Sequence, residues 1–290
     1  MQLAIQNLSK RYANGVQALD NVSLTIAPGM FGLLGPNGAG KSTLMRTLAT
    51  LQEADSGTAT FDGMDVLREK DRVRRILGYL PQEFGVYPKV TAAEMLDHFA
   101  RLKGVTDSKA RKATVDALLE RTNLANVRKQ RLGGFSGGMR QRFGIAQALI
   151  GNPKLIIVDE PTAGLDPEER VRFHNLLADI GRDVIVILST HIVDDVADLC
   201  PTFAVISKGQ VLLTGEPRAQ VERLRGKIWR RVVAREELES IQSTMPVIST
   251  RLQSGSTVVR AYSDAPPAGF ESVEPDLEDV YFSAVAGHLK

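Results

Sequence analysis

The chain has 290 residues, which fits about two domains of roughly 150 residues each. Hydrophobic residues make up 43%, charged residues 24% and aromatic residues 6%, and this composition excludes a mostly disordered protein. The 36 basic and 34 acidic residues leave a net charge of +2, which excludes a large basic field for wrapping nucleic acid, and we expect no nucleic-acid partner.

The first 215 residues carry the pattern of one α/β unit. Alternating hydrophobic residues and short apolar runs predict strands at residues 3–10, 22–26, 30–34, 57–61, 155–158 and 184–188. Helices are predicted at residues 43–51, 91–103 and 108–121, the second of which starts with the capping-box pattern Thr91-x-x-Glu94. Because apolar strands lie next to helices, we expect an α/β core.

The character of the chain changes near residue 216. Six basic residues without an acid lie between Arg223 and Arg235, and strand-like segments follow at residues 247–252 and 257–261. We therefore predict a small α+β unit over residues 216–290, appended to the unit over residues 1–215. The basic cluster is either a contact for anionic lipid or for loops of a partner or, more commonly, a solvated charged face.

Neither a membrane span nor a leader is visible in the sequence. The longest apolar run covers residues 184–188, whereas a helix needs about 20 residues to cross a bilayer. The first residues lack the apolar stretch of a signal peptide. The single cysteine, Cys200, forms no intrachain disulfide and is expected in the core or at a helix end. These features predict a cytoplasmic location.

A phosphate-binding loop is the strongest local pattern. Its G-x-x-x-x-G-K-[ST] form lies between a predicted strand and a predicted helix, as the motif requires. Glycines let backbone N–H groups point inward, and the helix N-terminus adds its positive end. The side chain of Lys41 would neutralise phosphate oxygens, and Ser42 would ligate Mg²⁺. The predicted ATP-binding residues of this loop are Gly35, Pro36, Asn37, Gly38, Ala39, Gly40, Lys41, Ser42 and Thr43.

Two adjacent carboxylates end the predicted strand at residues 155–158. In α/β sheets, ligands bind beyond the carboxyl ends of the strands, which is where Asp159 and Glu160 lie. Asp159 is expected to hold Mg²⁺, and Glu160 to polarise an attacking water. A solvated acidic strand end is the alternative, and the upstream Lys41 makes it the weaker one.

The segment Phe135-Ser136-Gly137-Gly138-Met139 resembles the signature motif of ABC-type ATPases. Phe135 replaces the leucine that is usual in the family, whereas the four following residues keep the family form. The resemblance covers residues 1–215 and implies a P-loop NTPase fold of the ABC ATPase type. Such a fold has a RecA-like core, an antiparallel β subdomain and a helical subdomain, here expected at about residues 88–152.

Further residues match the family's motifs one by one. The resemblance implies that Tyr12 stacks on adenine, that Gln82 is the Q-loop glutamine at Mg²⁺, and that His191 is the switch histidine at the γ-phosphate. It also implies that Ala163-Gly164-Leu165-Asp166 is the D-loop, in which we single out Asp166. An exposed tyrosine at Tyr12 and a core or surface histidine at His191 are the alternatives.

The resemblance also implies a partner arrangement. In this family one chain does not bring its signature onto its own phosphate-binding loop, so two chains pack head to tail around two MgATP molecules. Residues Ser136, Gly137, Gly138 and Met139 would then contact the ATP of the partner chain. ATP binding would close a homodimer or a dimer with another ATPase chain, and ATP hydrolysis would reopen it.

The chain resembles the drug, polyketide and ABC-A-like exporters within the family. Three stretches carry this resemblance, at residues 80–87, 188–193 and 277–282. It implies a separately encoded membrane permease, with the chain at the cytoplasmic face of the membrane. Phe84, Val86 and Tyr87 are either apolar surface for that permease or part of the domain's own core.

The alternative is a soluble ABC ATPase that acts on ribosomes or DNA. Such proteins usually carry two nucleotide-binding units in tandem, or a long coiled-coil insertion. This sequence has one phosphate-binding loop and no sustained heptads between residues 41 and 136, which favours the transporter.

Overall fold

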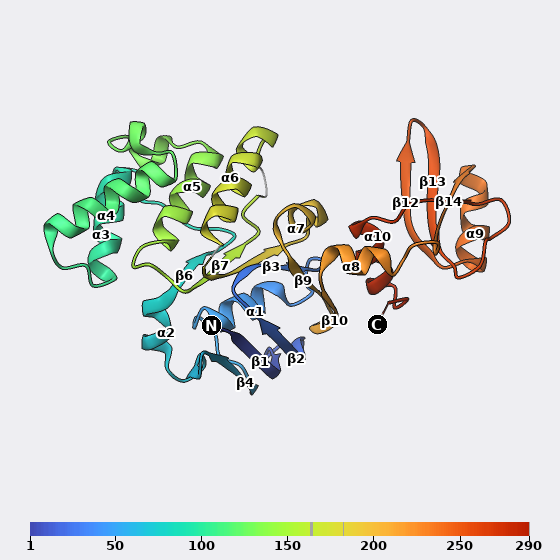
Figure 1. Ribbon diagram of the computed structural model, residues 1–290, viewed down its shortest axis with the longest axis horizontal. Helices are drawn as coiled ribbons and strands as arrows, with labels where there is room; N and C mark the ends of the chain where they lie inside the picture. Colours follow the sequence, from blue (N-terminus) through green and yellow to red (C-terminus); the bar gives the residue numbers. More distant parts are fainter. Residues whose placement is uncertain (163–164, 182, 290) are drawn as a thin grey trace.

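A computed structural model describes residues 1–162, 165–181 and 183–289 of the chain (Figure 1). Among these residues, the central sheet has the strand order β10-β9-β3-β8-β7-β6. Neighbouring strands are parallel except for β10, which is antiparallel to β9. The bounds are β3 (Gly29–Leu34), β6 (Leu77–Leu80), β7 (Leu155–Asp159), β8 (Ile185–Thr190), β9 (Thr202–Ser207) and β10 (Gln210–Gly215).

A separate antiparallel sheet lies beneath the central sheet in Figure 1. Its strand order is β2-β1-β4-β5, with β1 (Leu3–Arg11), β2 (Gln17–Ile26), β4 (Ser56–Phe61) and β5 (Met64–Asp65). β2 begins five residues before its predicted start because Gln17 and Leu19 pair with the end of β1. The predicted strands of the first unit are all present. In the central sheet, β6, β9 and β10 add to the predicted strands.

Helices cover both faces of the central sheet. Their bounds are α1 (Lys41–Leu48), α2 (Lys70–Ile76), α3 (Ala92–Leu102), α4 (Ser108–Arg121), α5 (Gly137–Ala148), α6 (Pro167–Ile180) and α7 (Val193–Leu199), with 3₁₀ turns η1 (Ala125–Val127) and η2 (Leu132–Gly134). At α3 the expected capping box is confirmed, because Glu94 N donates to Thr91 Oγ1 and Thr91 N donates to Glu94 Oε2.

Each central strand divides its side chains between two cores. On β8, Val186 and Leu188 belong to the core under α3 to α7, whereas Ile185 and Ile187 belong to the core that contains α1 and the antiparallel sheet. Each such fully buried aliphatic side chain stabilises the fold by about 1.5–3 kcal/mol. α1 and α5 therefore lie on opposite faces of the central sheet.

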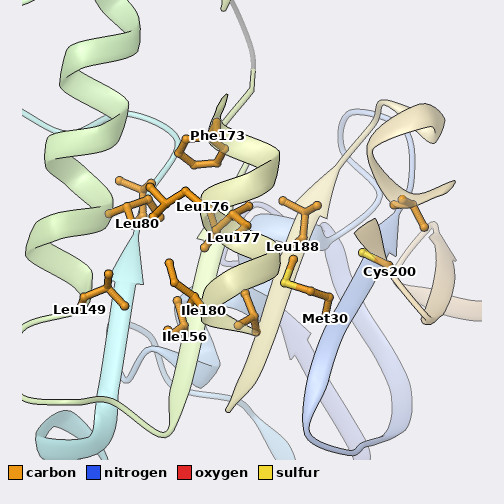
Figure 2. Packing of buried hydrophobic residues seen from close by; sticks show 14 of the residues in the cluster. Met30, Leu80, Leu149, Ile156, Phe173, Leu176, Leu177, Ile180, Leu188 and Cys200 are labelled. Atoms are coloured by element: carbon orange, nitrogen blue, oxygen red, sulfur yellow. The ribbon is translucent and has the colours of Figure 1, made fainter. Parts of the chain in front are cut away.

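Figure 2 shows the core under α6 from close by. Leu177 and Ile180 point from α6 towards Ile156 and Leu188 on the strands. Cys200, the C-cap residue that follows α7, belongs to the same core, and burial raises the pKa of its thiol. The expectation of a core or helix-end cysteine is confirmed.

Residues beyond β10 form a further sheet, with the strand order β12-β13-β11-β14. The elements are α8 (Pro217–Glu222), β11 (Ile228–Val233), η3 (Arg235–Glu237), α9 (Leu238–Thr244), β12 (Val247–Gln253), β13 (Ser256–Tyr262), β14 (Glu271–Ser272) and α10 (Leu277–Val285). α10 returns to the first unit, where Leu277, Val280 and Ala284 share a core with Val196 of α7.

Two members of the predicted basic cluster, Lys227 and Arg230, meet acidic side chains of this second unit. Lys227 Nζ lies 3.1 Å from Asp264 Oδ1, and Arg230 Nη1 lies 2.8 Å from Glu271 Oε1. These pairs lie on the surface, as a solvated charged face requires. No helix among the described ranges of the chain is both long and apolar enough to cross a membrane.

Candidate active site

Parallel strand pairing brings the predicted motifs to one edge of the central sheet. Leu34 of β3 pairs with Thr190 of β8, Asp159 of β7 pairs with Ser189 of β8, and Leu80 of β6 pairs with Val158 of β7. The strands therefore end side by side, and the residues that follow them lie at the same edge. These following residues are the phosphate-binding loop, Glu160, His191 and Gln82.

The phosphate-binding loop needs glycine at particular positions. Gly38 and Gly40 have φ of +79° and +108°, which L side chains rarely adopt. A Cβ at Gly35 would lie 2.3 Å from Ile206 O, and one at Gly40 would lie 2.3 Å from Ala18 O. The motif's glycines thus allow both the curl of the loop and its close packing against neighbouring strands.

The loop leads directly into α1, which begins at Lys41, two residues before the predicted start. Gly40 is the N-cap and forms no side-chain cap, so the N–H groups of the first turn remain available for an anion. Tyr12 lies beside this helix, because its hydroxyl is 3.1 Å from Thr43 Oγ1 and donates to Gln52 Oε1 at 2.9 Å. The stacking of Tyr12 on adenine stays a prediction.

Lys41 links the loop to the carboxylate of Glu160. Its Nζ donates to the carbonyl oxygens of Gly35 at 2.7 Å and Pro36 at 3.3 Å, and lies 3.3 Å from Glu160 Oε1. The side chains of Lys41 and Glu160 are each only 6% exposed. Their attraction is therefore little screened by water, and phosphate oxygens would compete with Glu160 for the ammonium.

Glu160 and His191 form a pair at the ends of β7 and β8. His191 Nδ1 is hydrogen-bonded to Glu160 Oε2, and Glu160 N donates to Ser189 O at 2.8 Å. Glu160 has φ of +50°, an uncommon conformation for a residue other than glycine. The Glu160 carboxylate is buried, whereas the His191 side chain is 48% exposed and can reach a ligand from the outer side.

Asp159 provides a test of the expected Mg²⁺ site. Its side chain is buried, and Oδ1 has no hydrogen-bond partner, so a hard oxygen ligand is free to accept a cation. Burial raises the pKa of this carboxyl, and the charge of Glu160 adds to the rise while that of Lys41 opposes it.

The oxygen ligands near Asp159 suit a magnesium ion that is bound together with the phosphates of a nucleotide. Among the residues that the structure describes, no group of three or more His, Cys, Asp or Glu side chains could hold a metal ion. Mg²⁺ needs no such cage, since one or two protein ligands with substrate phosphates and water complete its shell. Asp159 and the hydroxyl of Ser42 meet that need.

Gln82 and Asp166 lie outside the regular helices and strands. Gln82 is exposed, two residues after the end of β6. Asp166 is the N-cap of α6, where its carboxylate accepts a hydrogen bond from Glu169 N at 2.9 Å. Two residues of the predicted D-loop, Ala163 and Gly164, lie outside the described residues.

The predicted signature forms the N-terminus of α5. Ser136 is its N-cap and accepts a hydrogen bond from Met139 N at 3.2 Å. A Cβ at Gly137 would meet nothing within 4 Å, whereas one at Gly138 would lie 2.5 Å from Glu169 Oε2. Phe135, in the usual leucine position, is buried and packs edge-on against Phe143, so it anchors the start of α5.

Within one chain, the signature and the phosphate-binding loop belong to helices on opposite faces of the central sheet. Phe143 of α5 lies in one core, and Leu44 of α1 lies in the other. The site at the strand ends therefore comprises the loop, Asp159, Glu160 and His191, with the signature on a separate helix.

A buried carboxylate that the sequence did not single out supports this site. Asp195 of α7 is fully buried and accepts hydrogen bonds from Thr162, Thr190, Arg170 and His174. Burial raises the pKa of this carboxyl, but hydrogen bonds from His174 and Thr162 and the charge of Arg170 hold the pKa below its ordinary value.

An apolar groove of about 810 Å³ lies between the end of α1, β6 and α3. Its lining includes Leu51 and Leu102, which are 64% and 71% exposed. The sequence left open whether Phe84, Val86 and Tyr87 form a surface for the permease or part of the domain core. Phe84 and Val86 are partly buried and pack against the core. Tyr87 is 66% exposed.

Residues 19–163 match the family described as ABC transporter. The probable multidrug ABC transporter ATP-binding protein YbhF of Escherichia coli is 32% identical over 98% of this chain, which spans 52% of that relative's length. The uncharacterized ABC transporter ATP-binding protein YxlF of Bacillus subtilis is 32% identical over 98% of this chain and 99% of its own length. The daunorubicin/doxorubicin resistance ATP-binding protein DrrA of Streptomyces peucetius is 34% identical over 90% of this chain and 80% of its own.

Solved structures support the same assignment. The dimeric post-hydrolysis structure of the cassette MJ0796 bound to ADP and Pi is 25% identical with a TM-score of 0.67, covering 74% of this chain and 98% of that one. An ATP-binding subunit of an ABC transporter is 26% identical with a TM-score of 0.69, covering 84% of this chain and all of that one. The expected fold and the resemblance to exporter-type relatives are thus confirmed, and the chain belongs to the family of ABC transporter ATP-binding proteins.

Proposed function

We propose that this protein binds and hydrolyses MgATP and thereby drives a separately encoded membrane permease, with export as the direction of transport. The observation that carries the proposal is the convergence of Lys41, Glu160 and His191 at the strand ends, beside Asp159. Residues 1–215 would form the ATP-binding unit and residues 216–290 an accessory unit. The protein would lie at the cytoplasmic face of the membrane, held by the permease.

Each residue of the site has a chemical task in this proposal. The Lys41 ammonium would bind β- and γ-phosphate oxygens, while Tyr12 would lie against the adenine. The Glu160 carboxylate would orient the attacking water and accept its proton, since positioning and charge stabilisation are most of what a protein contributes to phosphoryl transfer. When bound with ATP, Mg²⁺ would neutralise phosphate charge, and Ser42, Gln82 and Asp159 would hold it.

The signature calls for a second copy of the chain. Because α5 and α1 lie on opposite faces of the sheet, residues 136–139 would bind the ATP held by the phosphate-binding loop of a partner chain. The dimeric cassette MJ0796 supports this arrangement. A homodimer would have two complete sites, because this chain carries Glu160, His191 and the signature together.

The groove beside α3 would receive the permease. Its exposed Leu51 and Leu102 favour an apolar segment. Among the described residues, three basic side chains line the groove with only one acidic side chain, Asp71, which pairs with Arg74 at 3.3 Å, and this excess of positive charge favours a segment that also carries acidic residues. The occupant would be a short cytoplasmic helix of the permease. The names of the relatives, which are transporter ATP-binding proteins, support a membrane partner.

Turnover of Glu160→Gln tests the hydrolytic role. We expect MgATP binding to persist and steady-state ATP hydrolysis to slow by about 100-fold or more, because the amide cannot accept the proton. Glu120→Gln, an exposed change on α4, is the matched control and should hydrolyse ATP normally. Normal hydrolysis by Glu160→Gln would refute the assigned role. Purification of the chain with a membrane protein supports the transporter, whereas purification with ribosomes or DNA contradicts it.

A further inference from the structure

The carboxylate of Asp195 connects four segments of the chain. Its Oδ1 accepts from Arg170 Nε at 2.8 Å and lies 2.8 Å from His174 Nε2, both on α6. Its Oδ2 accepts from Thr162 Oγ1 at 2.6 Å and from Thr190 Oγ1 at 3.4 Å. The side chain is 0% exposed, so water does not replace any of these donors.

Two of these donors lie beside the catalytic pair. Thr162 is two residues after Glu160, and Thr190 comes directly before His191. Thr190 Oγ1 also accepts from Ile192 N at 3.0 Å, which fixes the backbone on the far side of His191. One buried carboxylate thus holds both segments whose side chains meet in the Glu160–His191 hydrogen bond.

The helix that carries Asp195 is itself held firmly. A Cβ at Gly32 of β3 would lie 2.7 Å from Val196 Cγ1, so only a glycine lets α7 come this close to the strand that leads into the phosphate-binding loop. Val193 and Val196 of α7 are buried in the core. Close packing therefore fixes Asp195 relative to the sheet. The segments that contain Thr162 and Thr190 are positioned by their hydrogen bonds to its carboxylate.

The negative charge of the buried Asp195 carboxylate is compensated by a neighbouring positive charge. Arg170 Nη2 lies 2.7 Å from Asp195 Oδ1 and supplies the opposite charge. A buried charge with hydrogen-bonded partners is tolerated, whereas the loss of the carboxylate would leave the guanidinium and the imidazole facing an empty space.

We propose that Asp195 is a positioning residue that sets the geometry of Glu160 and His191 for ATP hydrolysis, without contacting the nucleotide. The inference rests on the proposed ATPase function. Among the described residues, the nucleotide-binding side chains have no contact with Asp195: Lys41 Nζ donates to Gly35 O, and the hydroxyl of Tyr12 lies beside Thr43. Loss of Asp195 therefore lowers kcat and leaves the affinity for MgATP nearly unchanged.

The test combines kinetics with hydrogen exchange. For Asp195→Ala we expect kcat to fall about 10-fold or more and KM for MgATP to stay within about threefold, with faster amide exchange at residues 158–162 and 189–193. Asp194→Asn is the matched control, since this neighbour on α7 is exposed. A parallel loss of MgATP affinity and kcat, or unchanged kcat in a folded Asp195→Ala protein, would overturn the proposal.

A second pair of variants keeps the test decisive if Asp195→Ala does not fold. Thr162→Val removes the hydroxyl that reaches Asp195 while keeping the shape, and Thr162→Ser restores it. We expect Thr162→Val to lower kcat and speed exchange in both segments, and Thr162→Ser to resemble wild type. Equal exchange in the two variants contradicts the positioning role. If the wild-type chain fails to hydrolyse ATP, the proposed function is wrong, and the exchange data still decide whether Asp195 orders these segments.

Discussion

The Lys41 ammonium lies 3.3 Å from Oε1 of Glu160, with both side chains almost fully enclosed by protein. The other carboxylate oxygen, Oε2, is hydrogen-bonded to His191. Glu160 therefore lies between Lys41, which would bind the phosphates, and His191, which would contact the γ-phosphate from the exposed side of the site. A γ-phosphate that draws Lys41 towards itself would release one oxygen of Glu160 for the attacking water.

The role of Lys41 predicts a loss of nucleotide affinity in Lys41→Ala. The change removes the buried cation at the start of α1, so the affinity for MgATP should fall about 10-fold or more. Titration with a fluorescent ATP analogue measures this affinity. Lys154→Ala is the matched control, because Lys154 is exposed and precedes β7 at the opposite edge of the sheet. Equal affinities of the two variants would show that Lys41 does not bind the phosphates.

Asp159→Asn should stabilise the fold and reduce turnover. The pKa of Asp159 is raised in the folded protein, so the folded state takes up a proton more readily than the unfolded chain, and the charged carboxylate costs stability at neutral pH. We expect the free energy of unfolding at pH 7.5 to rise by about 1 kcal/mol in Asp159→Asn. The gain should shrink as the pH falls towards the raised pKa, where the wild-type carboxyl becomes neutral.

Urea unfolding at several pH values measures the gain in stability, and ATP hydrolysis at varied Mg²⁺ measures the loss of turnover. Asp194→Asn, at an exposed position, should change neither. A destabilised Asp159→Asn protein would contradict the cost assigned to the buried charge.

Gly137→Ala separates folding from dimer function. A Cβ at Gly137 meets nothing within 4 Å in its own chain, so the variant should fold with a stability within about 0.5 kcal/mol of wild type. The same methyl group would lie between the signature and the ATP of a partner chain, and we expect ATP hydrolysis to fall about 10-fold or more. Gly85→Ala also adds a Cβ in open space and serves as the steric control. Full activity of Gly137→Ala would place the signature away from the nucleotide.

The groove beside α3 predicts variants that lose the permease but keep the site. Leu51→Asp and Leu102→Asp put a charge on exposed apolar lining, so co-purification with the permease and its stimulation of ATP hydrolysis should be lost. Hydrolysis by the isolated subunit should remain. Leu252→Asp, at an 82% exposed leucine of the second unit, is the control. Normal coupling in both groove variants would show that the permease docks elsewhere.

Local patterns predicted much of the fold because they report local physics. The capping box at Thr91 and Glu94 and the helix at residues 108–121 were predicted correctly, since caps and helical spacing act within a few residues. The position of the phosphate-binding loop, Asp159 and Glu160 at the carboxyl ends of strands was also predicted, because each motif directly follows an apolar strand. Strands β6 and β9 were missed, because β6 pairs with β7 and β9 pairs with β3, and both partners are distant in the sequence. Strand β10, which pairs with β9, was missed with it.

Asp195 shows why the rest of the site could not be predicted. Asp194 and Asp195 look alike in the sequence, as acidic residues in the first turn of a helix. Only the fold makes one exposed and the other buried, because the partners of Asp195 on α6 lie 21 and 25 residues away. The left-handed conformation of Glu160 also has no local sequence signal; its backbone N donates to Ser189 O of β8, which is distant in the sequence.

The mass of Glu160→Gln in solution, measured by light scattering with and without MgATP, tests the central claim most directly. The variant keeps Lys41 and the signature but cannot complete hydrolysis, so it should be a monomer alone and a dimer of twice that mass with MgATP. Addition of Gly137→Ala to this variant should prevent the dimer. A mass that does not change with MgATP would contradict the claim that two copies of this chain enclose ATP between them.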